Sequence, residues 1–112
     1  MATRSARLAY GTTSEAGDNF VFTGPAGITT IVKSIYLFNT SGETASPLLL
    51  IEDSAGIRIW FYYVVSFLEN TDTRLDPCWL VLNPGDQLDI FSEVTGLMYN
   101  VSGAYLPGTA EE

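Results

Sequence analysis

The stretch GIRIWFYYVVSFLEN, Gly56 to Asn70, decides the fold class of this chain. From Ile59 to Val65 it contains seven consecutive apolar or aromatic residues. A membrane-spanning helix needs about 20 such residues, and this run is closed by Arg58 and Glu69. Aromatic and β-branched side chains favour extended structure. The stretch therefore predicts a β-strand of a folded core and not a membrane segment.

Turn-forming clusters of Asn, Asp, Gly and Pro divide the rest of the chain into similar short segments. In the cluster NPGD, Pro84 presets φ and Gly85 supplies the positive φ of a type II turn. No segment combines ten residues of helical period with a cap. We predict an all-β, single-domain, two-sheet antiparallel β-sandwich, jelly-roll-like, of about eight strands. The expected strands cover approximately residues 5–10, 18–23, 28–39, 46–52, 56–67, 74–82, 86–93 and 97–106.

Length and charge indicate one acidic domain with a basic start. The 112 residues carry five basic and thirteen acidic side chains, a net charge of −8. We divide the chain into a basic N-terminal arm with the first strand (1–14), a β-sandwich domain (15–108) and an acidic tail (109–112). The arm holds Arg4 and Arg7 and no acid, and is either a docking element or a solvated leader. An acidic body repels nucleic acid and anionic membranes, so neither is expected as a partner. The start MATRSARLAYG has no apolar run typical of a secretion signal.

The sequence offers little for catalysis. It has no histidine and a single cysteine, Cys78, which excludes His-based triads and Cys/His zinc sites. Cys78 is expected to be a small buried apolar residue. The carboxylate pairs lie in or next to polar turns, where carboxylates normally face water. We expect no enzyme, no metal and no cofactor; the pairs are Glu52–Asp53, Asp72–Asp76 and Asp86–Asp89.

The predicted strand 56–67 is apolar on both faces. One face carries Ile57, Ile59, Phe61, Tyr63 and Val65, and the other carries Arg58, Trp60, Tyr62 and Val64. The segment 31–38 is similar, with Lys33 on one face and Ser34 on the other. A two-layer sandwich covers only one face of each strand. The second face therefore needs a loop of the same chain, a third layer or another subunit.

The composition of these faces favours a subunit or partner contact, because Trp, Tyr and Arg are enriched in buried interfaces. We predict that this contact uses Arg58, Trp60, Tyr62 and Val64, and that Trp60→Ala weakens assembly while strand content is retained. A second reading makes Trp60, Tyr62 and Trp79 a stacking platform for carbohydrate.

Several strand-and-turn pieces in order resemble small virion proteins of tailed bacteriophages. They are YLFNTSG, IEDSAG, the aromatic strand, ENTDTRLD, LVLNPGDQLDIFS and VSGAYLPG, within about residues 28–108. An apolar strand followed by a PGD turn also occurs in trimeric tumour-necrosis-factor-like and other jelly-roll domains. The resemblance implies a β-sandwich without catalytic residues, made in the host cytoplasm, and commonly trimeric. It also implies a place on the virion, either on the capsid exterior or in a head–tail component.

The leading hypothesis from the sequence is a capsid decoration protein on the virion exterior of a bacteriophage. This viral structural protein would form a homo-oligomer, with a homotrimer favoured by the resemblance, and bind the major capsid protein or another virion protein. Its arm would dock Arg4 and Arg7 onto acidic groups of a neighbouring coat subunit. The alternative is a carbohydrate- or receptor-binding β-sandwich module of a tail or fibre.

Overall fold

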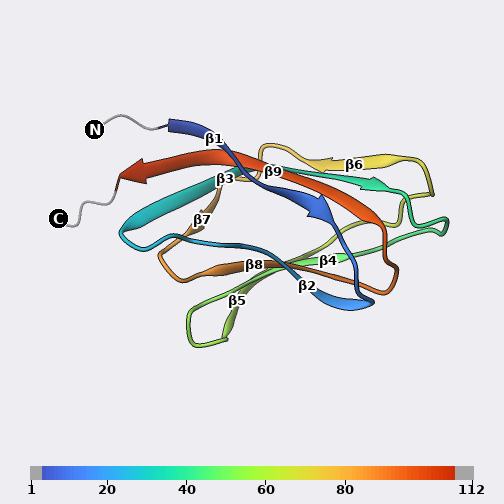
Figure 1. The fold of residues 1–112 in the computed structure, drawn as a ribbon, viewed down its shortest axis with the longest axis horizontal. Helices are drawn as coiled ribbons and strands as arrows, with labels where there is room; N and C mark the ends of the chain where they lie inside the picture. The colour runs from blue at the N-terminus through green and yellow to red at the C-terminus, as the bar shows by residue number, and fades with distance from the viewer. Residues whose placement is uncertain (1–3, 108–112) are drawn as a thin grey trace.

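The computed structural model describes residues 4–107, so residues 1–3 of the arm and the expected tail 109–112 lie outside it. The described chain forms nine antiparallel strands in two packed sheets (Figure 1). Their bounds are β1 Arg4–Thr12, β2 Gly17–Thr23, β3 Ile28–Asn39, β4 Leu48–Glu52, β5 Arg58–Tyr63, β6 Asp72–Leu75, β7 Leu80–Leu82, β8 Gln87–Ser92 and β9 Leu97–Pro107.

The strand pairing is that of a jelly roll. β1 pairs with β9, β2 with β8, β3 with β6 and β7, and β4 with β5. These nested antiparallel pairs amount to one long hairpin that rolls up into two layers. Sheet A has the order β1-β9-β3-β6, with β7 also beside β3, and sheet B has the order β2-β8-β4-β5. The predicted all-β two-sheet sandwich is confirmed.

The core lies between the two sheets and is built from alternating inward side chains. β3 contributes Val32, Ile35 and Leu37, each at most 1 % exposed, and facing strands of sheet B contribute aliphatic partners. Burying one such side chain stabilises the fold by about 1.5–3 kcal/mol. The partners from β4 and β8 are Leu49, Ile51, Leu88 and Ile90.

Two predicted strands differ from the structure. The expected strand 74–82 is interrupted between β6 and β7, because Pro77 has no N–H to donate and Trp79 adopts a left-handed φ of 49°. In the interruption, the Cys78 N–H donates to the Lys33 carbonyl at 2.9 Å. The expected strand 56–67 is shorter as β5, and beyond it the Val64 N–H donates to the Pro47 carbonyl at 2.9 Å.

Bulges change the alternation in sheet A. The β3–β9 register shifts between Val32 and Ser34. Because Val32 and Ile35 both point into the core, Lys33 and Ser34 both lie on the outer face. Simple alternation placed these two residues on opposite faces. Next to the bulge β9 approaches β3 so closely that a Cβ at position 103 would overlap the Ile31 carbonyl oxygen, which explains Gly103.

Asn39 organises the loop after β3. Its side chain is fully buried. Its Nδ2 donates to the Glu43 carbonyl at 2.6 Å and to the Phe67 carbonyl at 3.3 Å. Its Oδ1 accepts from the Ser41 N–H at 2.9 Å and from the Ser41 hydroxyl at 2.6 Å. One buried amide thus joins the turn at 39–43 to the segment that follows β5.

Candidate functional site

The outer face of sheet B is an aromatic surface. One row of paired residues crosses the sheet as Phe20, Asp89, Leu50 and Phe61. In the next row, Phe91 and Tyr63 flank Leu48. The four rings are 44–69 % exposed, although their strands belong to a well-packed sandwich. We call Phe20, Phe61, Tyr63 and Phe91, with Leu48 and Leu50, the aromatic face.

Most of the side chains predicted for the interface point toward the core in the structure. Trp60 pairs with core residue Ile51 and packs against the core, and Val64 is 7 % exposed within the core cluster. Tyr62 pairs with Leu49 and lines a small internal cavity, while remaining 42 % exposed at its edge. Arg58 is exposed.

The outward apolar side chains of this strand are therefore the set that the sequence reading placed inside. Ile59, Phe61 and Tyr63 are each more than half exposed. Both alternating sets are large and apolar, so the pattern could not tell which faced the core. The pairing of β5 with Leu49 and Ile51 of β4 decides it.

Asp89 is a buried carboxyl in the middle of the aromatic face. It is 1 % exposed, and its neighbours Leu88 and Ile90 both point into the core. Oδ1 accepts a hydrogen bond from Gln87 Nε2 at 2.8 Å, and Oδ2 has no partner. Burial, together with the nearby carboxylates of Asp18 and Glu52, raises the pKa of Asp89 to about 7, although the Gln87 bond acts in the opposite direction.

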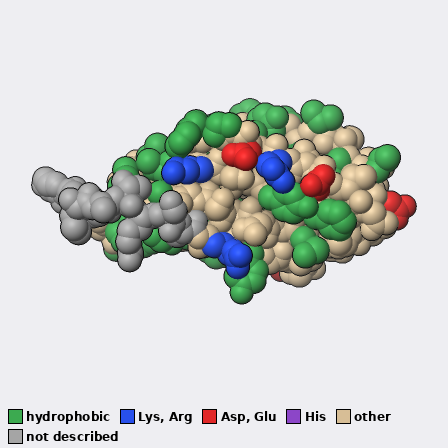
Figure 2. Space-filling view, turned by 90° about the horizontal axis from the view of Figure 1, so that it is seen from above, with side chains coloured by type: hydrophobic (Ala, Val, Ile, Leu, Met, Phe, Trp, Pro, Cys, Tyr) green, Lys and Arg blue, Asp and Glu red, His purple; other side chains and the backbone are tan. Residues whose placement is uncertain are grey.

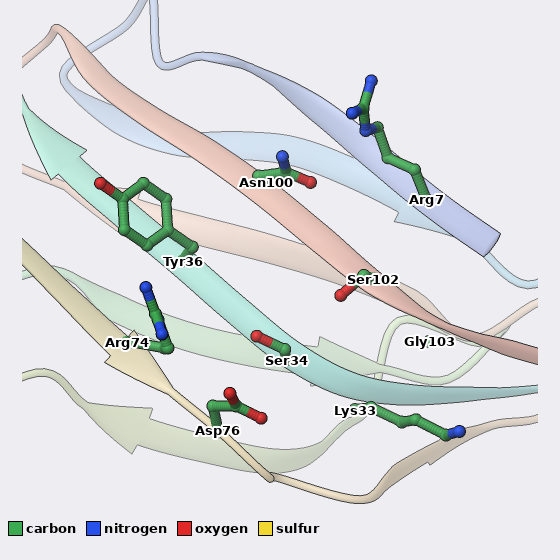
Figure 3. A pocket seen from close by; sticks show the side chains of 9 residues that line it. All are labelled: Arg7, Lys33, Ser34, Tyr36, Arg74, Asp76, Asn100, Ser102 and Gly103. Carbon is green, nitrogen blue, oxygen red and sulfur yellow. The ribbon is translucent and has the colours of Figure 1, made fainter. Parts of the chain in front are cut away.

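The outer face of sheet A carries a wide polar hollow of about 680 Å³. Figure 2 shows this face from above, with basic groups around a largely uncharged centre. The floor is made by the small polar side chains Ser34, Asn100 and Ser102 of the central strands β3 and β9 (Figure 3). The long side chains of the outer strands make its rim. We call this feature the basic hollow; its lining comprises Arg7, Lys33, Ser34, Tyr36, Arg74, Asp76, Asn100, Ser102 and Gly103.

Three irregularities of sheet A meet at this hollow. A register shift in β1 between Arg7 and Ala9 leaves Arg7 paired with Ser102. The bulge in β3 leaves Ser34 paired with the same Ser102 and adds Lys33 to the outer face. The segment between β6 and β7 lies against β3 at Lys33, whose carbonyl accepts the Cys78 N–H. Bulges commonly re-aim side chains next to functional sites.

The basic hollow concentrates positive charge in an acidic protein. Its lining holds three of the five basic residues and one of the thirteen acidic residues. The lining therefore carries +2, and the rest of the chain, with two basic and twelve acidic residues, carries −10. Such segregation produces a local field that attracts anions even though the whole molecule is negative.

Each cation of the hollow lies over an aromatic ring. Arg7 lies 5.3 Å from the centroid of Tyr10, and Arg74 lies 5.4 Å from that of Tyr36. Lys33 lies 5.6 Å from the centroid of Trp79. These cation–π contacts restrict the long side chains at modest cost to their accessibility. Desolvation, with Asp72 adding to it, raises the pKa of Tyr36, so its hydroxyl stays a donor at neutral pH.

Of the two predicted docking residues, Arg7 belongs to the basic hollow, and Arg4 begins β1 with its side chain outside the described part. Sequence reasoning missed Lys33 and Arg74. The only sequence signal was the scarcity of basic residues in the chain, because the three cations come from β1, β3 and β6 and meet only through the register of the sheet.

Burial raises the pKa of Cys78, whose Sγ lies 3.4 Å from the Val32 carbonyl oxygen, so it stays a thiol at neutral pH. Of the pair Asp72 and Asp76, only Asp76 lines the hollow. Between residues 4 and 107 there is no group of three His, Cys, Asp or Glu that could hold a metal. The same part of the chain has no helix long and apolar enough to cross a membrane.

No family model matches the chain, and no curated protein matches it. Similar solved structures include chains described as "Structure of infectious bursal disease virus Gx strain" and "Structure of infectious bursal disease virus Gt strain". The first has a TM-score of 0.46 and 11 % identity, and covers 96 % of this chain and 32 % of that chain. The second has a TM-score of 0.40 and 11 % identity, and covers 92 % of this chain and 32 % of that chain. This chain spans about a third of their length, and likeness at this level carries no argument about function.

Proposed function

We propose that this chain is a structural virion protein, a capsid decoration protein that acts as a homo-oligomer on the outside of a bacteriophage head. The observation that carries the proposal is the aromatic face, a large apolar surface on the outside of a sandwich whose core is already complete. The virion assignment rests on the resemblance of the strand-and-turn pieces. The jelly-roll topology is compatible with it, because capsid proteins and lectins both use this architecture.

The size of the aromatic face supports a second copy of the chain as its occupant. Its four rings each expose about half of a side-chain area of roughly 200 Å², which gives roughly 400 Å² of aromatic surface. Apolar patches of this size on a monomer are often functional. A standard interface buries about 800 Å² per partner. The rings, with exposed Ile59 of the same strand β5 as Phe61 and Tyr63, are sufficient for the apolar centre of one such contact.

The position of β5 supports the same occupant. β5 is the edge strand of sheet B, so one side of its backbone is not paired within the sheet. Exposed apolar edge strands readily associate with another chain. We place the contact on Arg58, Ile59, Phe61 and Tyr63. The trimeric state is a proposal from the resemblance, and docking of the capsid by Arg4 and Arg7 remains a prediction.

Light scattering after size exclusion, over a dilution series, tests self-association. We expect a mass near a multiple of 12.2 kDa, three-fold for a trimer. Phe61→Ser should lower the mass toward that of the monomer without loss of strand content. Met98→Ser is the matched control, because Met98 is 46 % exposed and lies on sheet A, whereas Phe61 is 54 % exposed and lies on sheet B.

A monomer at every concentration up to the millimolar range would contradict self-association through this face. The virion assignment has its own test, which is mass spectrometry of purified virus particles from cells that carry the gene. Presence of the chain at a stoichiometry comparable to that of the coat protein is expected. Its absence from the particles would contradict the assignment.

A further inference from the structure

We infer that the basic hollow of sheet A is a binding site for a carboxylated sugar chain, such as a uronic-acid oligosaccharide. This site lies on the sheet opposite to the aromatic face and does not depend on self-association through that face. It assigns Arg7 to a sugar carboxylate instead of to the acidic groups of a coat subunit. Its volume of about 680 Å³ falls within the range of about 300–1,000 Å³ that is usual for ligand sites.

The cations of the hollow account for recognition of the carboxylate. Arg7 and Arg74 lie at the rim on β1 and β6, and Lys33 lies at the rim beside the bulge of β3 with its amino end directed away from the floor (Figure 3). A guanidinium presents paired donors that match a carboxylate in a bidentate geometry. Because both guanidinium groups lie over tyrosine rings, less side-chain entropy is lost when they bind an anion.

The uncharged part of the hollow favours a sugar over an acidic protein surface. Ser34, Asn100 and Ser102 place donors and acceptors along the floor, as sugar hydroxyls require. Asp76 is the single carboxylate of the lining. It can accept hydrogen bonds from the hydroxyl groups of a sugar, which the carboxylate side chains of an acidic peptide do not offer.

The exposed ring of Trp79 and the small number of cations also help to identify the class of ligand. Trp79 lies beside the hollow with Lys33 over one face of its ring and is 60 % exposed, so the rest of the ring is accessible to the C–H face of a sugar. Trp79 is one of the three aromatics that the sequence suggested for carbohydrate. Nucleic acid does not fit, because its affinity comes from neutralising many phosphates, and the hollow has three cations in a chain of net charge −8.

Titration calorimetry and amide NMR shifts with tetra-galacturonate at low salt test this site. We expect saturable binding whose shifts map to β3, β6 and β9. The fully methyl-esterified tetrasaccharide, which lacks the negative charge, should not bind. Arg7→Gln and Arg74→Gln should each weaken binding about five- to tenfold, and raised salt should weaken it further.

Glu93→Gln is the control, because Glu93 is an exposed charged residue that lies outside the lining of the hollow and outside the aromatic face. It should leave the affinity unchanged. Thermal unfolding of each variant separates loss of binding from loss of fold, and Lys33→Gln provides a third cation variant should either arginine variant not fold.

Three results would overturn the assignment. The first is the absence of binding by tetra-galacturonate at low salt. The second is equal binding of the methyl ester, which would mean that the cations do not take part. The third is binding of a hexaglutamate peptide as tight as that of the uronate, which would mean that the hollow receives an acidic protein surface. None of these results bears on self-association, which is measured on the other sheet.

Discussion

Replacing Asp89 with asparagine tests whether this buried carboxyl makes the stability of the protein depend on pH. The side chain is 1 % exposed, and Oδ2 has no hydrogen-bond partner. Burial is the main cause of its pKa of about 7, with Asp18 and Glu52 acting in the same direction. Near neutral pH the carboxyl is therefore partly protonated in the folded state, whereas in the unfolded chain, with a pKa near 3.8, it is ionised.

The sign of the pH effect follows from proton binding. Between about pH 4 and 7 the folded state holds a proton on Asp89 that the unfolded chain has lost. The free energy of unfolding therefore decreases as pH rises through this window. A pKa of about 7 against 3.8 corresponds to at most about 4 kcal/mol, because one pKa unit is worth about 1.4 kcal/mol. Asp89 lies on an outer face with water at its rim, so screening reduces the expected effect to about 1–2 kcal/mol.

Urea unfolding of the wild type and Asp89→Asn at pH 5, 6, 7 and 8 measures this effect. The wild type should lose about 1–2 kcal/mol of stability from pH 5 to 8. The variant should show a much smaller slope, match the wild type at pH 5 and exceed it at pH 8. Asp18→Asn should reduce the slope partially, because Asp18 contributes to the raised pKa. A wild-type stability that is flat or rises over this range, or a variant with the same slope, would refute the reasoning.

Three further substitutions test other parts of the fold. Gly103→Ala should destabilise the protein by about 2–3 kcal/mol in urea unfolding, because its Cβ would push β9 away from the Ile31 carbonyl; an unchanged midpoint would contradict the close approach. Asn39→Ala should cost about 2–3 kcal/mol, since it removes the buried amide that joins two loops; a loss below 0.5 kcal/mol would argue against that role. Trp60→Ala should lower the thermal midpoint by circular dichroism, since Trp60 packs against the core; a weakened oligomer with unchanged stability would restore the interface role that the sequence suggested.

Local sequence signals predicted most of the strands. The segment 28–39 was expected as one strand and is β3, because TGPAG and NTSG provide clear turns at its two ends. The interruption at 76–79 was missed. The only local signal of a break is Pro77, which has no backbone N–H and stands next to an apolar run. The two register shifts of sheet A, in β1 and β3, were missed as well. A bulge arises from the fit between two strands, and neither strand shows it alone.

The candidate surfaces were harder to predict, because both depend on pairing between distant segments. The sequence shows that strand 56–67 is apolar on both faces. Which face points into the core is set by pairing with Leu49 and Ile51 of β4. The basic hollow joins positions 7, 33 and 74 through the pairing of β1 and β3 with β9 and of β6 with β3. No local pattern in the sequence brings these three positions together.

Asp89 also connects the stability of the monomer with its proposed self-association. A second copy that covers the aromatic face would remove the remaining water from around the row that contains Phe20 and Asp89. Removing water penalises the charged carboxylate further, so the bound state would hold its proton more tightly than the free monomer. By linkage, association through this face takes up protons and weakens as pH rises above 7. An oligomer formed through the basic hollow of sheet A would lack this dependence, because Asp89 lies on the other sheet. The pH dependence of the mass thus identifies which face of the sandwich is in contact.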